Sequence, residues 1–113
     1  RSVTATDYLA ALDWAARLRE ALSPIFERCD AILCPAAPSS APNGLSSTGS
    51  AMFNGVWTFC GLPAVTLPLF VDTDGLPMGL QLVGRPGDDA RLLRTARWLS
   101  DFARARDAQE EPE

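Results

Sequence analysis

The side chains best suited to nucleophilic chemistry are the serines of residues 44–50, which read Gly-Leu-Ser-Ser-Thr-Gly-Ser. A serine hydroxyl attacks a carbonyl carbon only when a base within hydrogen-bond reach accepts its proton. The sequence contains no histidine and no lysine, and all ten of its basic residues are arginine. Arginine stays protonated in proteins, so it cannot be that base at neutral pH. We interpret Ser46 and Ser47 as loop serines and predict no catalytic residue in this chain.

Two cysteines and one aspartate are the other reactive candidates. Cys60 precedes Gly61 at a predicted helix end, where the partial negative charge of a helix C-terminus disfavours a thiolate. We therefore expect a buried structural thiol at Cys60, and likewise at Cys34 in a predicted strand. Asp30, at the start of that strand, could be a general base, but we favour a role in orienting a loop. Three cysteines without a C-x-x-C pair and without histidine predict neither a disulfide framework nor a metal site, and no cofactor motif is present.

Composition limits the possible partners. The formal net charge is −4 and no basic patch is present, which argues against nucleic acid and against an anionic membrane surface. No apolar run approaches the roughly 20 residues of a membrane span, and no signal-peptide pattern opens the chain. The unpaired cysteine pattern fits a reducing compartment, so the predicted location is cytoplasmic.

Hydrophobic residues at three- and four-residue steps predict a helix over Asp7–Leu22. Thr6 or Asp7 can cap its N-terminus. Pro24 stands where a new first turn would begin, so we expect a kink or a short second helix over Pro24–Arg28.

A brief apolar run and a long polar loop come next. Residues 30–34 are short enough for a buried strand, which Pro35 ends. Residues 36–49 consist mostly of alanine, proline, serine, asparagine and glycine and predict a loop. Loops of about a dozen residues without internal structure are usually functional or poorly ordered.

The second half predicts an α/β arrangement. Gly61 occupies the place of a helix C-cap glycine, and Gly75 closes a turn that needs a positive φ. In the last helix Leu93 and Phe102 are expected to widen a buried stripe. The expected segments are a helix over Ser50–Phe59, an antiparallel strand pair over Ala64–Val71 and Met78–Val83, and a helix over Asp89–Arg106 capped by Asp88.

Four segments in order carry a family resemblance: 7–12, 26–38, 53–84 and 88–93. The strongest contains Gly-Leu-Pro-Ala-Val-Thr at 61–66 and Gly-Leu-Pro-Met-Gly-Leu-Gln-Leu-Val-Gly at 75–84. Together they resemble the C-terminal part of the amidase-signature family, whose members are serine hydrolases that cleave carboxamides. The resemblance implies that residues 1–113 are the C-terminal segment of an α/β/α sandwich with a large mixed sheet.

The same resemblance implies where catalysis resides. The family uses a Ser-cisSer-Lys triad that belongs to the N-terminal portion, which is absent here. The parent protein is then an amidase that hydrolyses carboxamide C–N bonds, and the isolated chain is predicted to be inactive. Its partners would be a small-molecule amide in the full-length protein and the missing N-terminal portion.

The family resemblance also implies that this segment contributes part of the substrate wall. Its candidates for the acyl pocket are Ser50, Met52, Phe53 and Trp57, although core packing is an equal alternative for Trp57. The glutamine-using transamidosome subunits of the family carry an acidic residue near the position of Ala51. Alanine cannot hold a substrate ammonium there, which favours a general amidase of apolar or aromatic amides.

A second hypothesis comes from another functional class. The chain could be a non-catalytic binding or assembly module that self-associates through open strand edges.

Overall fold

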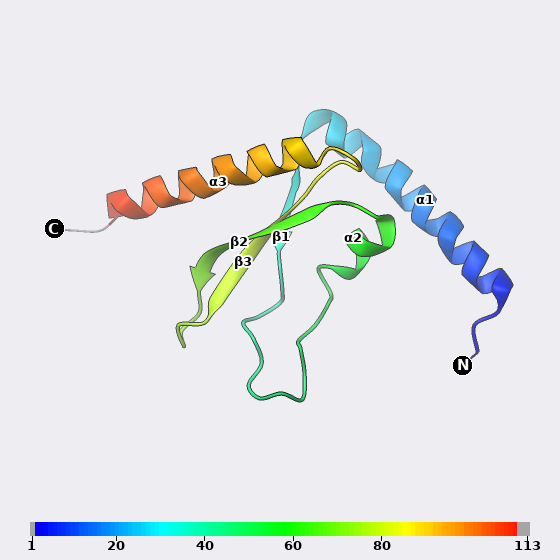
Figure 1. Cartoon of the computed structure of the whole chain (residues 1–113), viewed down its shortest axis with the longest axis horizontal. Coiled ribbons are helices and arrows are strands. Elements are labelled where there is room, and N and C mark those ends of the chain that lie inside the picture. The colour runs from blue at the N-terminus through cyan, green and yellow to red at the C-terminus, as the bar shows by residue number, and fades with distance from the viewer. Residues whose placement is uncertain (1, 111–113) are drawn as a thin grey trace.

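The computed structural model describes residues 2–110, which form three helices and one small sheet (Figure 1). The predicted α/β class is confirmed. In chain order the elements are α1 (Ala5–Arg28), β1 (Ile32–Pro35), α2 (Gly55–Cys60), β2 (Ala64–Val71), β3 (Pro77–Val83) and α3 (Asp89–Glu110).

The sheet has the order β1-β3-β2, and both neighbouring pairs are antiparallel. The antiparallel pairing predicted for β2 and β3 is therefore confirmed, and β2 has the predicted bounds. The register is irregular between Pro68 and Phe70. All pairing among the described strands is antiparallel, so a mixed sheet and a complete sandwich would require strands outside this segment.

Helix α1 starts earlier and ends later than predicted. Its N-cap is Thr4, not Thr6 or Asp7: the Thr4 hydroxyl accepts from the Asp7 amide at 3.2 Å, and the Asp7 carboxylate accepts from the Thr4 amide at 3.1 Å. Of the two expectations for Pro24, a kink or a second helix, the second helix is wrong, because α1 runs through Pro24 to Arg28. The last turn of α1 is stabilised by contacts with other parts of the chain. The Phe26 side chain is buried, and the Phe26 carbonyl accepts a hydrogen bond from Nη2 of Arg85 at 2.8 Å.

Helix α2 is shorter than the predicted Ser50–Phe59. The Ser50 hydroxyl accepts from the Met52 amide at 3.3 Å, a local bond that competes with helix formation. The predicted C-cap is confirmed, since Gly61 adopts φ 64° and its amide donates to the Thr58 carbonyl at 3.1 Å.

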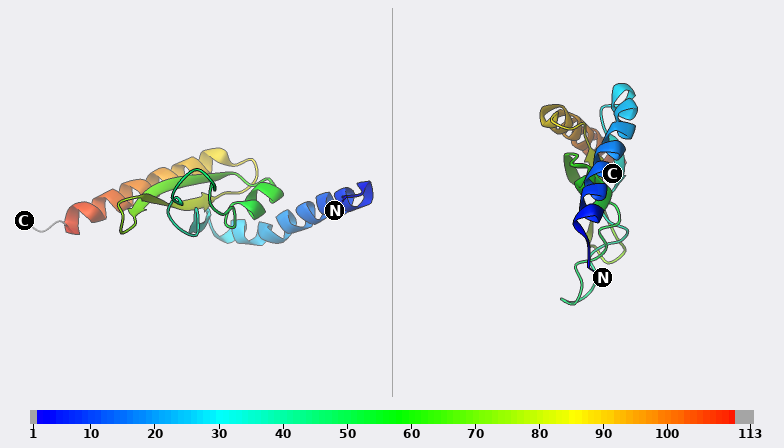
Figure 2. Two further views of the ribbon diagram at one scale, coloured as in Figure 1. Left: turned by 90° about the horizontal axis from the view of Figure 1, so that it is seen from below. Right: turned by 90° about the vertical axis from the view of Figure 1, so that its right-hand side faces the viewer.

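The two faces of the sheet carry two separate cores. Successive residues of a strand point to opposite faces, and Leu82 and Val83 of β3 are both buried. Val83 packs with Phe26 of α1 and Cys60 of α2 on one face. Leu82 packs with Leu92 of α3, and also with Ala96 of the same helix, on the other face. Figure 2 shows the sheet between α3 and the α1–α2 side.

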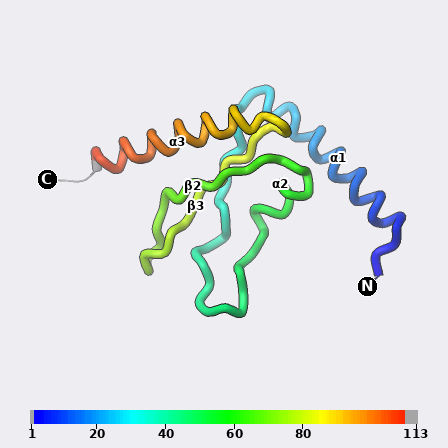
Figure 3. The backbone as a smooth tube through the Cα atoms, viewed as in Figure 1, coloured from blue at the N-terminus to red at the C-terminus, as the bar shows by residue number. Residues whose placement is uncertain are grey.

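The molecule is flat and open. Its extents are 64 × 40 × 17 Å and its radius of gyration is 17.4 Å, whereas a compact chain of this length has about 13 Å. Its accessible surface is 8663 Å², against about 6,000 Å² for a compact protein of its size. Figure 3 shows α1 and α3 extending away from the sheet in different directions.

The open shape explains one wrong prediction about α3. Leu93 and Phe102 do not widen the buried stripe, because their exposures are 60% and 50%. Helix α3 packs on β2 and β3. Leu92 and Ala96 face that sheet and Leu99 packs beside them, whereas the apolar side chains of Leu93, Trp98 and Phe102 remain at least half exposed in this segment.

Among residues 2–110, none of the helices combines the length and the hydropathy needed to cross a bilayer.

Candidate functional site

The candidate site is built around the long loop between β1 and α2, which leaves the sheet in Figure 1 and returns to it. Two hydrogen bonds close its neck. The Ala36 amide donates to the Gly79 carbonyl at 3.0 Å, and Nδ2 of Asn54 donates to the Ala36 carbonyl at 3.2 Å. Both ends of the loop are thereby attached to the end of the sheet.

A hollow of about 300 Å³ lies between this loop and the start of β3. Its lining contains hydroxyl groups and small apolar groups, and no charged side chain. This lining is suited to a neutral group, because it offers no side-chain countercharge to a charged one. The lining residues are Ala36, Ala37, Pro38, Ser39, Ser40, Ala41, Pro42, Thr48, Gly49, Ser50, Pro77, Met78 and Gly79.

Gly79 lines the hollow at a position that has no room for a side chain. A Cβ atom at this position would stand 2.5 Å from Cγ2 of Thr66 and 3.2 Å from the carbonyl oxygen of Leu67. It would also meet Cβ of Ala36 at 3.6 Å. Because this residue has no side chain, β2 and β3 can pack closely beside the hollow, whereas the contact with Ala36 of the loop is of ordinary van der Waals length.

The four predicted wall residues do not share one cavity within this segment. Ser50 lines the hollow, whereas Met52 is 69% exposed. Phe53 is half-buried, and its carbonyl accepts a hydrogen bond from Nε2 of Gln81 at 3.1 Å. Trp57 is half-buried and packs against the core around Phe26 and Cys60. Its indole Nε1 is buried and has no hydrogen-bond partner among the described residues.

The prediction from sequence did not include Gln81 among the site residues. It lies in the central strand with only 5% exposure. A signal was present, because a glutamine in the apolar run 78–83 requires a hydrogen-bond partner once the strand is buried. The sequence did not indicate which group would be that partner, because Phe53 is 28 residues away from Gln81.

Asp72 was also missed as a residue that shapes the site. Its carboxylate Oδ1 accepts from the amides of Asp74 at 2.9 Å and Leu76 at 2.8 Å, which fixes the turn between β2 and β3. The side chain of Ser40, in the lining of the hollow, and then these backbone hydrogen bonds lower the pKa of Asp72.

The reactive candidates occupy ordinary structural positions. Ser46 and Ser47 are exposed in the loop, and the Ser47 hydroxyl accepts from the Gly49 amide at 3.1 Å. Cys60 is fully buried, as predicted, and Cys34 is half-buried in β1. No group of three or more histidine, cysteine, aspartate or glutamate side chains within residues 2–110 is placed to hold a metal ion.

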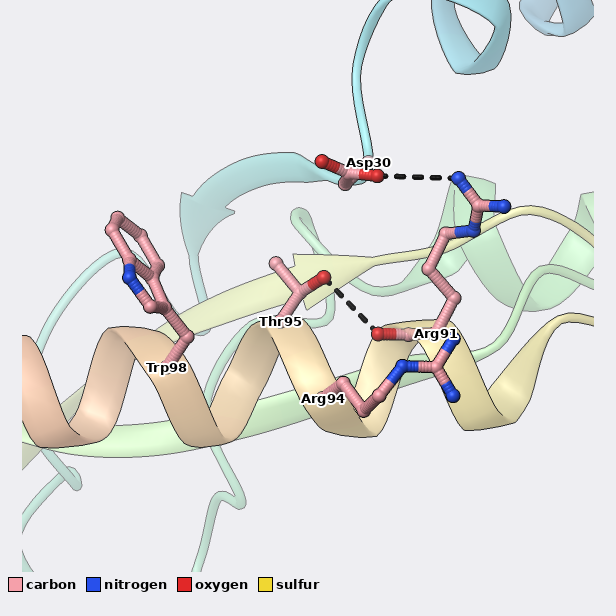
Figure 4. A pocket seen from close by; sticks show the side chains of 5 residues that line it. All are labelled: Asp30, Arg91, Arg94, Thr95 and Trp98. Carbon is pink, nitrogen blue, oxygen red and sulfur yellow. Dashed lines mark hydrogen bonds and ion pairs between the residues drawn. The ribbon is translucent and has the colours of Figure 1, made fainter.

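Asp30 faces a second hollow of about 460 Å³, formed with α3 (Figure 4). Its carboxylate pairs with Arg91 at 3.3 Å, and Arg91 also pairs with Asp88 at 2.9 Å. Asp30 thus connects the start of β1 to α3, which agrees with an orienting role. The remaining lining comes from Arg94, Thr95 and Trp98.

Comparison with known proteins decides the family. The family model described as Amidase matches residues 1–93. The chain belongs to the amidase family. The resemblance inferred from the sequence is thereby confirmed.

Two curated relatives illustrate the range of the family. A fatty acid amide hydrolase of Medicago truncatula is 38% identical over 108 residues, which cover 85% of this chain and 18% of the relative. A glutamyl-tRNA(Gln) amidotransferase subunit of Cereibacter sphaeroides is 45% identical over 86 residues, 68% of this chain and 17% of the relative. The chain therefore spans less than a fifth of the length of these amidase-family proteins.

Two solved structures share the fold. A protein described as an amidase superposes with a TM-score of 0.76 and 29% identity, covering 88% of this chain and 26% of that one. A 6-aminohexanoate cyclic dimer hydrolase, solved with its substrate, superposes with a TM-score of 0.61 and 23% identity over 81% of this chain and 23% of that one. At that identity the second likeness concerns the fold alone.

Proposed function

We propose that this chain is the C-terminal part of an amidase that hydrolyses carboxamide C–N bonds. In that enzyme it contributes three strands and one wall of the substrate cleft, and the nucleophile and its base come from outside residues 1–113. The observation that carries the proposal is the open shape: 8663 Å² of surface on a chain of this size fits a piece of a larger fold.

The proposed substrate is a neutral amide with an apolar or aromatic acyl group. The hollow beside Ser50 has no charged lining residue, and Ala51 offers no carboxylate for a substrate ammonium. The name of the Medicago relative, a fatty acid amide hydrolase, agrees with an apolar acyl group. A reducing compartment, the cytoplasm, agrees with three cysteines that are all free.

The alternative function, a module that self-associates through strand edges, has less support. Both outer strands carry a proline, Pro35 in β1 and Pro68 in β2. Proline removes a backbone donor, and the irregular register beside Pro68 further disrupts that edge. Regular pairing with a second copy along either strand is therefore hindered.

The experiment compares two proteins: the 113-residue chain and the product of the complete reading frame that contains it. We expect the longer protein to cleave a neutral amide such as hexanamide and to react with a serine-directed fluorophosphonate. The short chain should do neither, because it lacks a base. Cleavage by the short chain, abolished when Ser46 or Ser47 is replaced, would contradict the proposal, as would an inactive complete protein.

A further inference from the structure

Gln81 is a buried polar side chain in an otherwise apolar stretch of β3. Its exposure is 5%, and Leu82 and Val83 beside it are buried and apolar. A buried amide is tolerated when its polar atoms are paired. Nε2 of Gln81 donates to the carbonyl oxygen of Phe53 at 3.1 Å, and it lies 3.5 Å from Sγ of Cys34. This hydrogen bond joins the centre of the sheet to the segment that precedes α2.

The position of Gln81 itself is fixed by both neighbouring strands. It is paired with Cys34 of β1 and with Thr66 of β2 in the register of the sheet. Because side chains alternate along a strand, Gln81 shares its face with Gly79, which lines the hollow of the loop. The donor is therefore rigidly placed on the same face as the hollow.

The segment that receives this hydrogen bond, residues 50–54, contains three of the four predicted wall residues: Ser50, Met52 and Phe53. Phe53 is directly followed by Asn54, whose side chain holds the loop neck at Ala36. The Asn54 amide donates to the Ala51 carbonyl at 3.0 Å, so residues 51–54 form one turn. Fixing the Phe53 carbonyl thereby fixes a turn that begins immediately after Ser50.

We propose that Gln81 is a positioning residue that sets the distance between the substrate wall and the sheet. Through Phe53 it determines how large an acyl group the wall accepts. This inference rests on the proposed amidase function. Gln81 touches the wall and takes no part in bond cleavage, so its removal changes selectivity between substrates more than it changes the chemistry.

The test uses the complete amidase and two neutral linear amides, hexanamide and acetamide. Gln81→Met keeps the length of the side chain and removes the N–H donor. Thr66→Ser is the matched control, since Thr66 flanks Gln81 in the register but is exposed. The kcat/KM ratio of the two amides is measured for each protein, and active enzyme is counted by titration with a fluorophosphonate.

We expect Gln81→Met to change the hexanamide-to-acetamide ratio by about tenfold, mainly through the KM of the longer amide. The Thr66→Ser ratio should stay within about twofold of the wild type. A merely structural role predicts a different result, in which the titrated active fraction falls and the ratio stays the same. That result would overturn the inference.

Gln81→Leu provides a second variant of similar volume, in which no hydrogen-bond donor remains. We expect the same change of ratio, and it decides the question if Gln81→Met does not fold. If neither variant yields soluble protein, Gln81 is required for folding and the positioning role is overturned. If the wild type cleaves neither amide, the proposed function fails first, whereas an active wild type with unchanged variants refutes only the role of Gln81.

Discussion

Nε of Arg19 donates to the carbonyl oxygen of Cys60 at 2.7 Å and so connects the middle of α1 to the last residue of α2. The last carbonyls of a helix lack intrahelical partners, and a cation near them also interacts favourably with the helix dipole. Gly61 permits this contact, because a Cβ there would stand 3.3 Å from Nη2 of Arg19. One arginine therefore connects α1, which precedes β1, with α2, which follows the long loop.

We expect Arg19→Met to destabilise the protein by about 1 kcal/mol, since it removes a charged hydrogen bond that is only partly buried. Arg17→Met is the control on the same helix. Arg17 pairs with Asp13 at 2.8 Å, but both side chains are exposed, so its loss should cost about 0.5 kcal/mol or less. Urea unfolding of both variants measures the difference, and equal midpoints would contradict the role given to Arg19.

Gly79→Ala should destabilise the protein by about 1–3 kcal/mol, the usual cost of overpacking. The added methyl group would meet Cγ2 of Thr66 at 2.5 Å and the backbone oxygen of Leu67 at 3.2 Å. Thr66→Ser removes Cγ2, so the double variant should regain part of the loss. Gly55→Ala serves as a control, because nothing lies within 4 Å of the position its Cβ would take. Thermal unfolding of the four variants tests the contact, and an unaltered Tm for Gly79→Ala would disprove it.

Acid should loosen the turn between β2 and β3 through Asp72. Hydrogen bonds lower the pKa of this carboxyl in the folded protein. The stability it contributes is therefore fully present above its unfolded pKa of about 3.9, and it is lost as pH falls through the lower folded value. Amide exchange of Asp74 and Leu76, followed by NMR from pH 6 to pH 3, should show protection falling at the acid end.

Asp72→Asn distinguishes this cause from general acid unfolding. The asparagine oxygen can still accept from the two amides, but it does not titrate in this range. Protection of the turn in Asp72→Asn should therefore vary less with pH than in the wild type. If wild type and variant lose protection in parallel, a different carboxyl is responsible, and Asp7, whose pKa is also lowered by its hydrogen bonds to Thr4, is the next to replace.

Local signals in the sequence determined the elements better than their contacts. The bounds of β2 and the left-handed cap at Gly61 follow from strand-forming residues and a glycine, and both were predicted correctly. The capping box at Thr4 and Asp7 was equally local and was misassigned by two or three residues. The hydrogen bond from Gln81 to Phe53 could not be predicted, because it depends on where a loop returns to the sheet.

The exposure of Leu93 and Phe102 also could not be predicted from local sequence. Their spacing predicts burial, yet how much of a helix is covered depends on how many strands lie beneath it, and this segment has three.

If the rest of an amidase fold covers Leu93 and Phe102, replacing both residues with glutamine should have opposite effects in the 113-residue chain and in the complete protein. In the 113-residue chain it should reduce binding of the hydrophobic dye ANS and leave the helix content unchanged, because exposed apolar surface is removed. In the complete protein it should lower the free energy of unfolding by several kcal/mol, because two buried apolar side chains are lost. Leu92→Gln is the control: Leu92 is already buried in the 113-residue chain, so its replacement should destabilise both proteins. A complete protein whose stability is unaffected by the double replacement would show that this face of α3 remains in solvent, and the proposed place of the chain within a larger fold would then be wrong.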